Sequence, residues 1–117
     1  MTTYVTEKSI TLTSGIGKMK SAMIEDFKLF MEPEGEIRTK MNEEYAYSFE
    51  IKHGSKYIKI LSNRSATAFI VATDNDKKFK KGDILKPAGW AAPARNAARG
   101  NILDGNYPIN WTGPLYL

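Results

Sequence analysis

Residues 45–61, YAYSFEIKHGSKYIKIL, contain the clearest indication of a fold in the chain. Two runs rich in aromatic and β-branched residues flank His53-Gly54, a position suited to a two-residue turn. The sequence therefore predicts a β-hairpin with one apolar face and one mainly polar face. The four expected cross-strand pairs are Phe49 with Ile58, Tyr47 with Ile60, Glu50 with Tyr57, and Ser48 with Lys59. A slip of one residue would exchange the two faces, so the agreement between turn and pattern favours this register.

The residues that follow predict two further strands. Asn63-Arg64-Ser65 is a turn by composition, and residues 66–73 (ATAFIVAT) form a nearly continuous apolar run, typical of a strand covered on both faces. We expect it to be the central strand. Residues 74–77 (DNDK) predict another turn, and a reversal at Gly82-Asp83 precedes a short strand that Pro87 ends. Residues 45 to about 86 thus predict a mostly antiparallel meander.

The N-terminal part predicts a short strand and a helix. Residues 9–13 (SITLT) alternate apolar and polar side chains, which favours a strand. Apolar side chains then recur at helical spacing, and Pro33 and Gly35 are expected to end the helix. These side chains are Met19, Ala22, Met23, Phe27, Phe30 and Met31. The alternation of Phe27, Leu29 and Met31 also fits a strand, so that alternative stays open.

The C-terminal part predicts a short helix followed by an extended tail. After Trp90, the stretch AAPARNAARGN places Pro93 near a helix start and Gly100 at a C-terminal cap. Residues 107–117 (YPINWTGPLYL) contain prolines and many apolar side chains, so we expect an extended segment docked on the core. The expected fold is a single domain over residues 1–117, of class α+β: a mostly antiparallel meander with an N-terminal helix and a short C-terminal helix.

Length and composition are typical of one folded domain. The chain has 117 residues, of which 42% are hydrophobic and 26% charged. The absence of cysteine excludes disulfides, thiolate nucleophiles and cysteine-ligated metals. The N-terminus lacks the pattern of a secretory signal, and no apolar run approaches the length of a membrane span, about 20 residues. We therefore expect a soluble intracellular protein.

The charge is unevenly distributed along the chain. Residues 1–51 hold six Lys/Arg and nine Asp/Glu, whereas residues 52–99 hold eleven and three, within a formal net charge of +4. A local positive field of this kind attracts anionic partners such as phosphate groups. The alternative is a solvated lysine surface that serves solubility, and charge alone does not decide between the two.

The sequence motifs for catalysis or metal binding are incomplete. Gly15-Ile16-Gly17-Lys18 has Leu12 and Met19 where a phosphate-binding loop needs glycine and serine or threonine, which leaves a helix-entry turn. His53, the only histidine, lies in the expected hairpin loop. The cluster Asp74-Asn75-Asp76 lacks the next ligand of an EF-hand calcium loop, because position 78 is a lysine. We therefore expect no enzyme, no catalytic residue, no metal and no cofactor.

The basic segment alternates with aromatic side chains, as in single-strand nucleic-acid binders. The candidate nucleic-acid-binding residues are Lys52, Lys56, Tyr57, Lys59, Arg64, Lys77, Lys78, Lys80, Lys81, Arg95 and Arg99, with Lys86, Phe79 and Trp90 nearby. Tyr57 and Lys59 share a face in the expected register, so Tyr57 is the candidate for base stacking. The alternative is that the aromatic residues pack in the core, as we expect for Trp90, and that the lysines protect sheet edges.

The stretches GDILKPAGW, PARNAARGN and WTG in the second half resemble small uncharacterised proteins of tailed bacteriophages. The resemblance implies a phage accessory protein acting in the cytoplasm of a bacterial host, and it transfers no site residues. Two function classes remain: nucleic-acid binding through the basic surface of residues 52–99, or a protein-binding module that inhibits or redirects a host enzyme or defence factor. In the second class the contact would be a sheet edge or the aromatic tail. A structural role in the virion also stays open.

Overall fold

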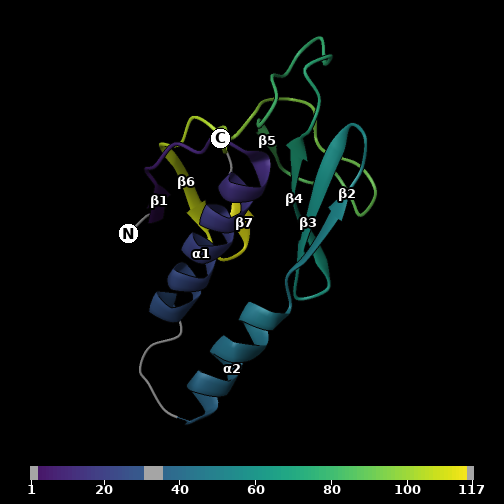
Figure 1. The fold of residues 1–117 in the computed structure, drawn as a ribbon. Helices are drawn as coiled ribbons and strands as arrows, with labels where there is room; N and C mark the ends of the chain where they lie inside the picture. Colours follow the sequence, from purple (N-terminus) through teal and green to yellow (C-terminus); the bar gives the residue numbers. More distant parts are fainter. Residues whose placement is uncertain (1–2, 31–35, 116–117) are drawn as a thin grey trace.

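The computed structural model describes residues 3–30 and 36–115, which form an α+β fold with two helices and two antiparallel sheets (Figure 1). The elements in chain order are β1 (Thr3–Val5), α1 (Leu12–Phe30), α2 (Glu36–Tyr47), β2 (Glu50–His53), β3 (Tyr57–Ser62), β4 (Ser65–Val71), β5 (Ile84–Leu85), β6 (Tyr107–Asn110) and β7 (Gly113–Pro114). The larger sheet has the strand order β2-β3-β4-β5 and the smaller one β1-β6-β7. Within the described ranges, no helix is long and apolar enough to cross a membrane.

Helix α1 begins at Leu12, so the strand predicted over residues 9–13 is wrong. The Thr11 hydroxyl oxygen accepts a hydrogen bond from the Ser14 amide at 3.1 Å, and the Thr11 carbonyl accepts one from the Gly15 amide at 3.0 Å. Threonine is favoured at this position because it satisfies an amide that the helix leaves unpaired. Ile10 is 98% exposed, which excludes the half-buried strand.

The helix predicted from Met19 onward is confirmed. Met19, Met23 and Phe27 are buried on one side of α1, as their spacing requires. Phe30 is exposed instead, and the predicted helix end at Pro33 and Gly35 lies outside the described residues.

The hairpin of β2 and β3 is confirmed, but its loop is longer and its register differs. His53 pairs with Ile58 and Ile51 with Ile60, so residues 54–56 connect the strands and His53 belongs to β2. Relative to the prediction, β2 is displaced by an even number of residues. An even displacement keeps each side chain on its predicted face. This explains why Ile51 still lies on the same face of the sheet as Ile58 and Ile60.

Residues 45–47 were predicted to begin the first strand of the hairpin, but in the structure they end helix α2. The Ser48 hydroxyl donates a hydrogen bond to the Tyr45 carbonyl at 2.6 Å, and the Ser48 amide donates to the same oxygen at 3.1 Å. Tyr45 is 2% exposed and Tyr47 88% exposed. Two residues this far apart share one face of a strand, whereas a helix turns them to opposite sides.

The rest of the meander follows the prediction. Asn63 and Arg64 form the loop between β3 and β4, with positive φ values of 48° and 63° that fit a two-residue hairpin turn. Strand β4 lies inside the larger sheet and its centre is buried, which confirms the predicted central strand. The reversal at Gly82-Asp83 and the short strand β5 are also confirmed.

The short helix predicted after Trp90 is absent, and the segment runs along the edge of β5 instead. The amides of Ala94 and Arg99 each donate to a β5-side carbonyl, Lys86 and Ile84 respectively, at 2.7 Å. The Ile84 amide donates to the Gly100 carbonyl at 2.9 Å. These bonds pair backbone groups at the edge of β5 that would otherwise lack partners. A helix of this length would not be stable alone, so the extended conformation is favoured.

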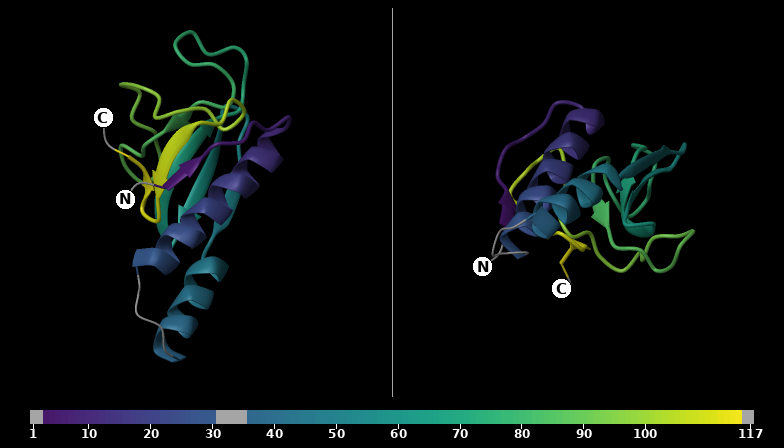
Figure 2. Two further views of the ribbon diagram at one scale, coloured as in Figure 1. Left: turned by 90° about the vertical axis from the view of Figure 1, so that its left-hand side faces the viewer. Right: turned by 90° about the horizontal axis from the view of Figure 1, so that it is seen from below.

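A different layer covers each face of the larger sheet (Figure 2). Ile58, Ile60 and Ile70 pack toward α1 and β6 in a first core, which the tail residues Tyr107 and Ile109 complete. The predicted extended docking of the tail is therefore confirmed. On the opposite face, Phe69, Val71 and Leu85 pack with Phe79 in a second core. Residues 74–100, which contribute Phe79 and Ala98 to this second core, carry seven of the 17 lysine and arginine residues of the chain.

Candidate nucleic-acid interface

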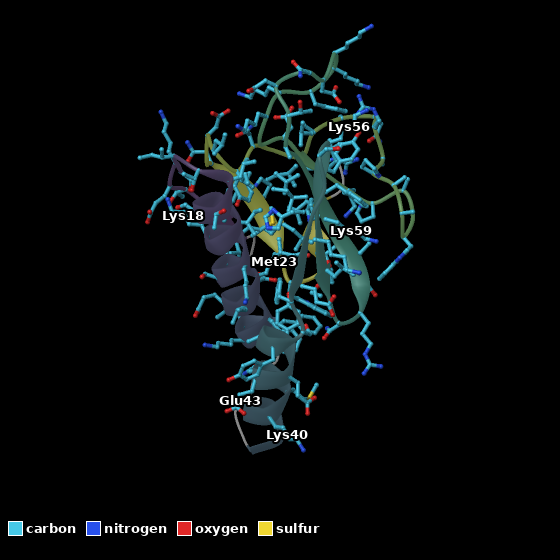
Figure 3. All side chains as sticks on the ribbon, turned by 45° about the vertical axis from the view of Figure 1, so that its right-hand side comes forward. Lys18, Met23, Lys40, Glu43, Lys56 and Lys59 are labelled. Carbon is cyan, nitrogen blue, oxygen red and sulfur yellow. The ribbon has the colours of Figure 1, made fainter. Side chains whose placement is uncertain are left out.

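Lys52 and Lys59 lie directly opposite each other on the neighbouring strands β2 and β3. Like charges in this arrangement destabilise a sheet, because the side chains of a cross-strand pair approach closely. Tyr57 precedes Lys59 by two residues and so lies on the same face, as predicted. An anion bound between the two ammonium groups would remove their repulsion. Figure 3 labels Lys59 on β3 and Lys56 in the hairpin loop that precedes this strand.

Trp90 lies against Lys59, one of these two lysines. The Lys59 Nζ atom is 3.7 Å from the centroid of the Trp90 ring. Such a contact stabilises by about 0.5–1 kcal/mol at an exposed site. Trp90 is 55% exposed, so the prediction that it belongs to the core is wrong. The surrounding small residues, PAGWAAP, show no apolar alternation, and that pattern could have indicated an exposed loop.

The other aromatic side chains of this region are less accessible. Phe79 is 6% exposed and belongs to the second core. Tyr57 is half-buried: its ring meets Phe69 edge-on at 6.1 Å, and its hydroxyl accepts a hydrogen bond from Arg95. Trp90 is therefore better placed than Tyr57 to stack on a base.

Arg95, one of the predicted binding residues, is held by Asp76. Its Nη1 and Nη2 atoms donate to the two Asp76 carboxylate oxygens, each at 2.9 Å. The amides of Lys78 and Phe79 also donate to this carboxylate, which is 1% exposed. The hydrogen bond from Arg95, followed by those from the two amides, holds the pKa of Asp76 well below its usual range. The pair fixes the segment after β5 to the loop after β4, so Arg95 has a structural role.

Asp76 is expected to make the fold sensitive to acid. Its pKa is lower in the folded than in the unfolded chain, so the carboxylate stabilises the fold above the unfolded value of about 3.9. This contribution is lost as the pH falls toward the folded-state pKa, because the unfolded chain then binds more protons. Between about pH 7 and pH 3, the Tm of the wild type should fall more steeply than that of Asp76→Asn. If the Tm of the wild type and of Asp76→Asn fell equally steeply with pH, the stabilising role of the Asp76 carboxylate would be contradicted.

An open cleft of about 570 Å³ lies between the hairpin loop and the loop after β4. Its lining residues are Ser55, Lys56, Thr73, Asn75, Asp76, Lys77 and Arg95. The Asp76 carboxylate is already bonded to Arg95, which leaves Lys56 and Lys77 as the charged groups available to a ligand. Ammonium, hydroxyl and amide donors together suit an anion such as phosphate.

Several predicted residues are engaged within the protein. The Lys78 Nζ atom donates to the Arg95 carbonyl at 2.6 Å, and the Arg99 Nη1 atom donates to the Leu115 carbonyl at 2.9 Å. Lys80 forms an ion pair with Asp104. Lys86 donates to the Pro114 carbonyl, and burial lowers its pKa. These side chains link distant segments, which explains part of the basic composition without a ligand.

Arg64 lies apart from the candidate interface. It occupies the loop between β3 and β4, about 17 Å from Tyr57 along β3. There it lines a different cleft, together with Glu43, Glu44 and Glu50. Lys81 is exposed near the reversal before β5. Of the predicted binding residues, the structure thus pairs Lys52 with Lys59 on the face of Tyr57 and places Lys56 and Lys77 at the cleft. Trp90, predicted to belong to the core, contacts Lys59.

His53 and residues 15–18, considered above as catalytic or phosphate-binding candidates, occupy ordinary positions in a strand and a helix. His53 is exposed at the end of β2, and residues 15–18 lie inside α1 instead of a turn before it. A Cβ on Gly15 would lie 2.9 Å from the Ile102 carbonyl oxygen, so this glycine allows α1 to approach the chain there. Among the residues that the structure describes, no group of three or more His, Cys, Asp or Glu side chains could hold a metal ion.

Comparison with known proteins gives one match. The model of a family of unknown function, DUF7717, matches residues 3–117. No curated protein and no solved structure matches the chain.

Proposed function

The chain belongs to this family of unknown function, and from its own surface we propose that it is a non-enzymatic nucleic-acid-binding protein. The observation that carries the proposal is the opposed pair Lys52 and Lys59 beside the exposed ring of Trp90. The cleft with Lys56 and Lys77 extends the same positive surface.

This surface fits a phosphate backbone for electrostatic reasons. Each lysine that neutralises a phosphate releases a condensed counterion, so binding is favoured at low salt whatever the base sequence. Lys52 and Lys59 repel each other in the unbound protein, and a bound phosphate would turn this repulsion into attraction. The bonded cations Lys80 and Arg99 are less suited, because a ligand would have to break their internal contacts first.

The proposal includes a biological setting. The resemblance of the second half to tailed-phage proteins supports a phage accessory protein that acts in the bacterial cytoplasm. Detection of the protein in infected cells but not in purified virions would support this setting, whereas its presence in virions would favour a structural role.

Charge reversal of the opposed lysines provides the test. The double variant Lys52→Glu with Lys59→Glu should bind a fluorescent oligonucleotide at least about tenfold more weakly than wild type, at roughly 50 mM salt. The slope of log affinity against log salt should fall by about 1.4 for a single strand if each lysine contacts one phosphate.

The matched control is Lys28→Glu with Lys40→Glu, on α1 and α2. Lys28 and Lys40 are exposed, and the control changes the net charge by the same amount. Equal loss of affinity in the two double variants would assign binding to net charge alone. No binding of the wild type to single or double strands at low salt would refute the proposal.

A second candidate function, protein binding, has its own observation. Leu29 and Phe30 at the end of α1 are 59% and 64% exposed, and they line a cavity of about 490 Å³ together with Trp111 of the tail. Apolar side chains that gather at the surface are typical of protein contacts. A nuclease-treated pull-down from host bacteria should recover a specific host protein with the wild type but not with Phe30→Asp. Recovery of nothing by the wild type would count against this function.

A further inference from the structure

Trp90 is a large aromatic side chain that the fold leaves in water. It is 55% exposed, whereas the neighbouring rings of Phe69 and Phe79 are 3% and 6% exposed. In the described part of the chain, the rings of Phe27, Tyr45 and Trp111 contact one another, but no ring contacts Trp90. A flat ligand that covered the indole ring would bury apolar surface that the folded chain leaves open.

We propose that the ligand is single-stranded nucleic acid and that an unpaired base stacks on Trp90, an inference that rests on the proposed function. Every base has a π-face, so stacking on an aromatic side chain is favourable whatever the sequence. In a duplex the bases already stack on one another, and a side chain can enter only by unstacking them. An exposed indole ring therefore favours unpaired bases over a duplex.

The Lys59 ammonium group is placed to bind the phosphate next to the stacked base. Its ammonium group lies over the Trp90 ring at 3.7 Å and opposite Lys52. A stacked base stabilises more than an exposed cation over the same ring. A base that takes this face of the ring therefore displaces Lys59 toward the nearest phosphate, where Lys52 adds a second positive charge.

The cleft at the hairpin loop provides the next phosphate position. Tyr57 lies between Lys59 and this cleft, and its hydroxyl accepts a hydrogen bond from Arg95, which lines the cleft. Lys56 and Lys77 stand at the cleft with the Ser55 and Thr73 hydroxyls. A strand with one base on Trp90 can thus extend its backbone along β3 toward Lys56 (Figure 3).

Three probes of equal length separate base stacking from phosphate binding. These are a single-stranded oligothymidylate of about 12 nucleotides, an oligomer with the same phosphates but no bases, and a duplex. By fluorescence anisotropy at low salt, Trp90→Ala should bind oligothymidylate about tenfold more weakly and the abasic oligomer as tightly as wild type does. Trp90→Phe should keep most of the affinity, and thermal unfolding verifies that both variants fold.

Intrinsic fluorescence gives a second readout, because the chain has two tryptophans. In Trp111→Phe, oligothymidylate should quench the fluorescence of Trp90, and the abasic oligomer should not. The inference is overturned if the duplex binds as tightly as oligothymidylate, or if Trp90→Ala weakens binding of the abasic oligomer equally. The proposed function survives both of these outcomes. It fails only if none of the three probes binds the wild type at low salt.

Discussion

Replacement of Gly100 with alanine is expected to lower the free energy of unfolding by about 3 kcal/mol and the Tm by roughly 10 °C or more. Gly100 has a φ of +139°, which residues with a side chain rarely adopt. An added Cβ atom would lie 2.5 Å from the Cβ atom of Tyr107. Tyr107 is 1% exposed and belongs to β6, so it cannot move without disturbing the first core.

A glycine of the same segment provides the control. A Cβ on Gly89 would meet no atom within 4 Å, so Gly89→Ala should change the free energy of unfolding by less than about 0.5 kcal/mol. Thermal unfolding of the two variants measures the difference. If Gly100→Ala melted at the temperature of Gly89→Ala, the close approach to Tyr107 would be refuted.

Gly100 also shows why the sequence suggested a helix after Trp90. A proline near the start, alanines between and a glycine at the end are compatible with a capped helix. The same residues satisfy the edge of β5, where Arg99 and Gly100 exchange hydrogen bonds with Ile84. The presence of that edge is a property of the assembled sheet, and no local pattern in the segment indicates it.

The parts of the fold that local chemistry determines could be predicted. Asn63-Arg64 and the apolar run after it indicate the β3–β4 hairpin and an inner strand, because the turn residues and the strand residues are adjacent. The start of β2 could not be predicted in this way. Residues 45–49 alternate as a strand would, and Tyr45 becomes helical because its ring is buried against α1, far away in the sequence.

The candidate interface likewise has features that could be predicted from the sequence and features that could not. The shared face of Tyr57 and Lys59 follows from the period of a strand and was predicted correctly. The bond of Arg95 to Asp76 and the exposure of Trp90 depend on how the loops after β4 and β5 meet. A count of charged residues therefore identified the basic segment but included cations that hold the fold together.

Removal of the Tyr45 side chain is expected to have the largest effect on stability, about 4 kcal/mol for Tyr45→Ala, or a Tm lowered by roughly 15 °C. Of the α2 side chains that the structure describes, residues 40–47, Tyr45 alone is buried. Its ring stacks on Phe27 with centroids 4.3 Å apart, and its hydroxyl donates to the Trp111 carbonyl at 2.6 Å. The variant should therefore release α2 from α1 and the tail.

Two further variants separate packing from hydrogen bonding. Tyr45→Phe keeps the stacked ring and should cost about 1 kcal/mol, the value of one hydrogen bond. Tyr47→Ala removes an 88% exposed tyrosine from the same helix and should change stability by less than about 0.5 kcal/mol. Amide hydrogen exchange should show that the α2 amides lose protection in Tyr45→Ala and keep it in Tyr45→Phe, because local opening follows the loss of buried contacts. Unchanged protection in Tyr45→Ala would mean that other contacts hold α2, and the stacking on Phe27 would then contribute little.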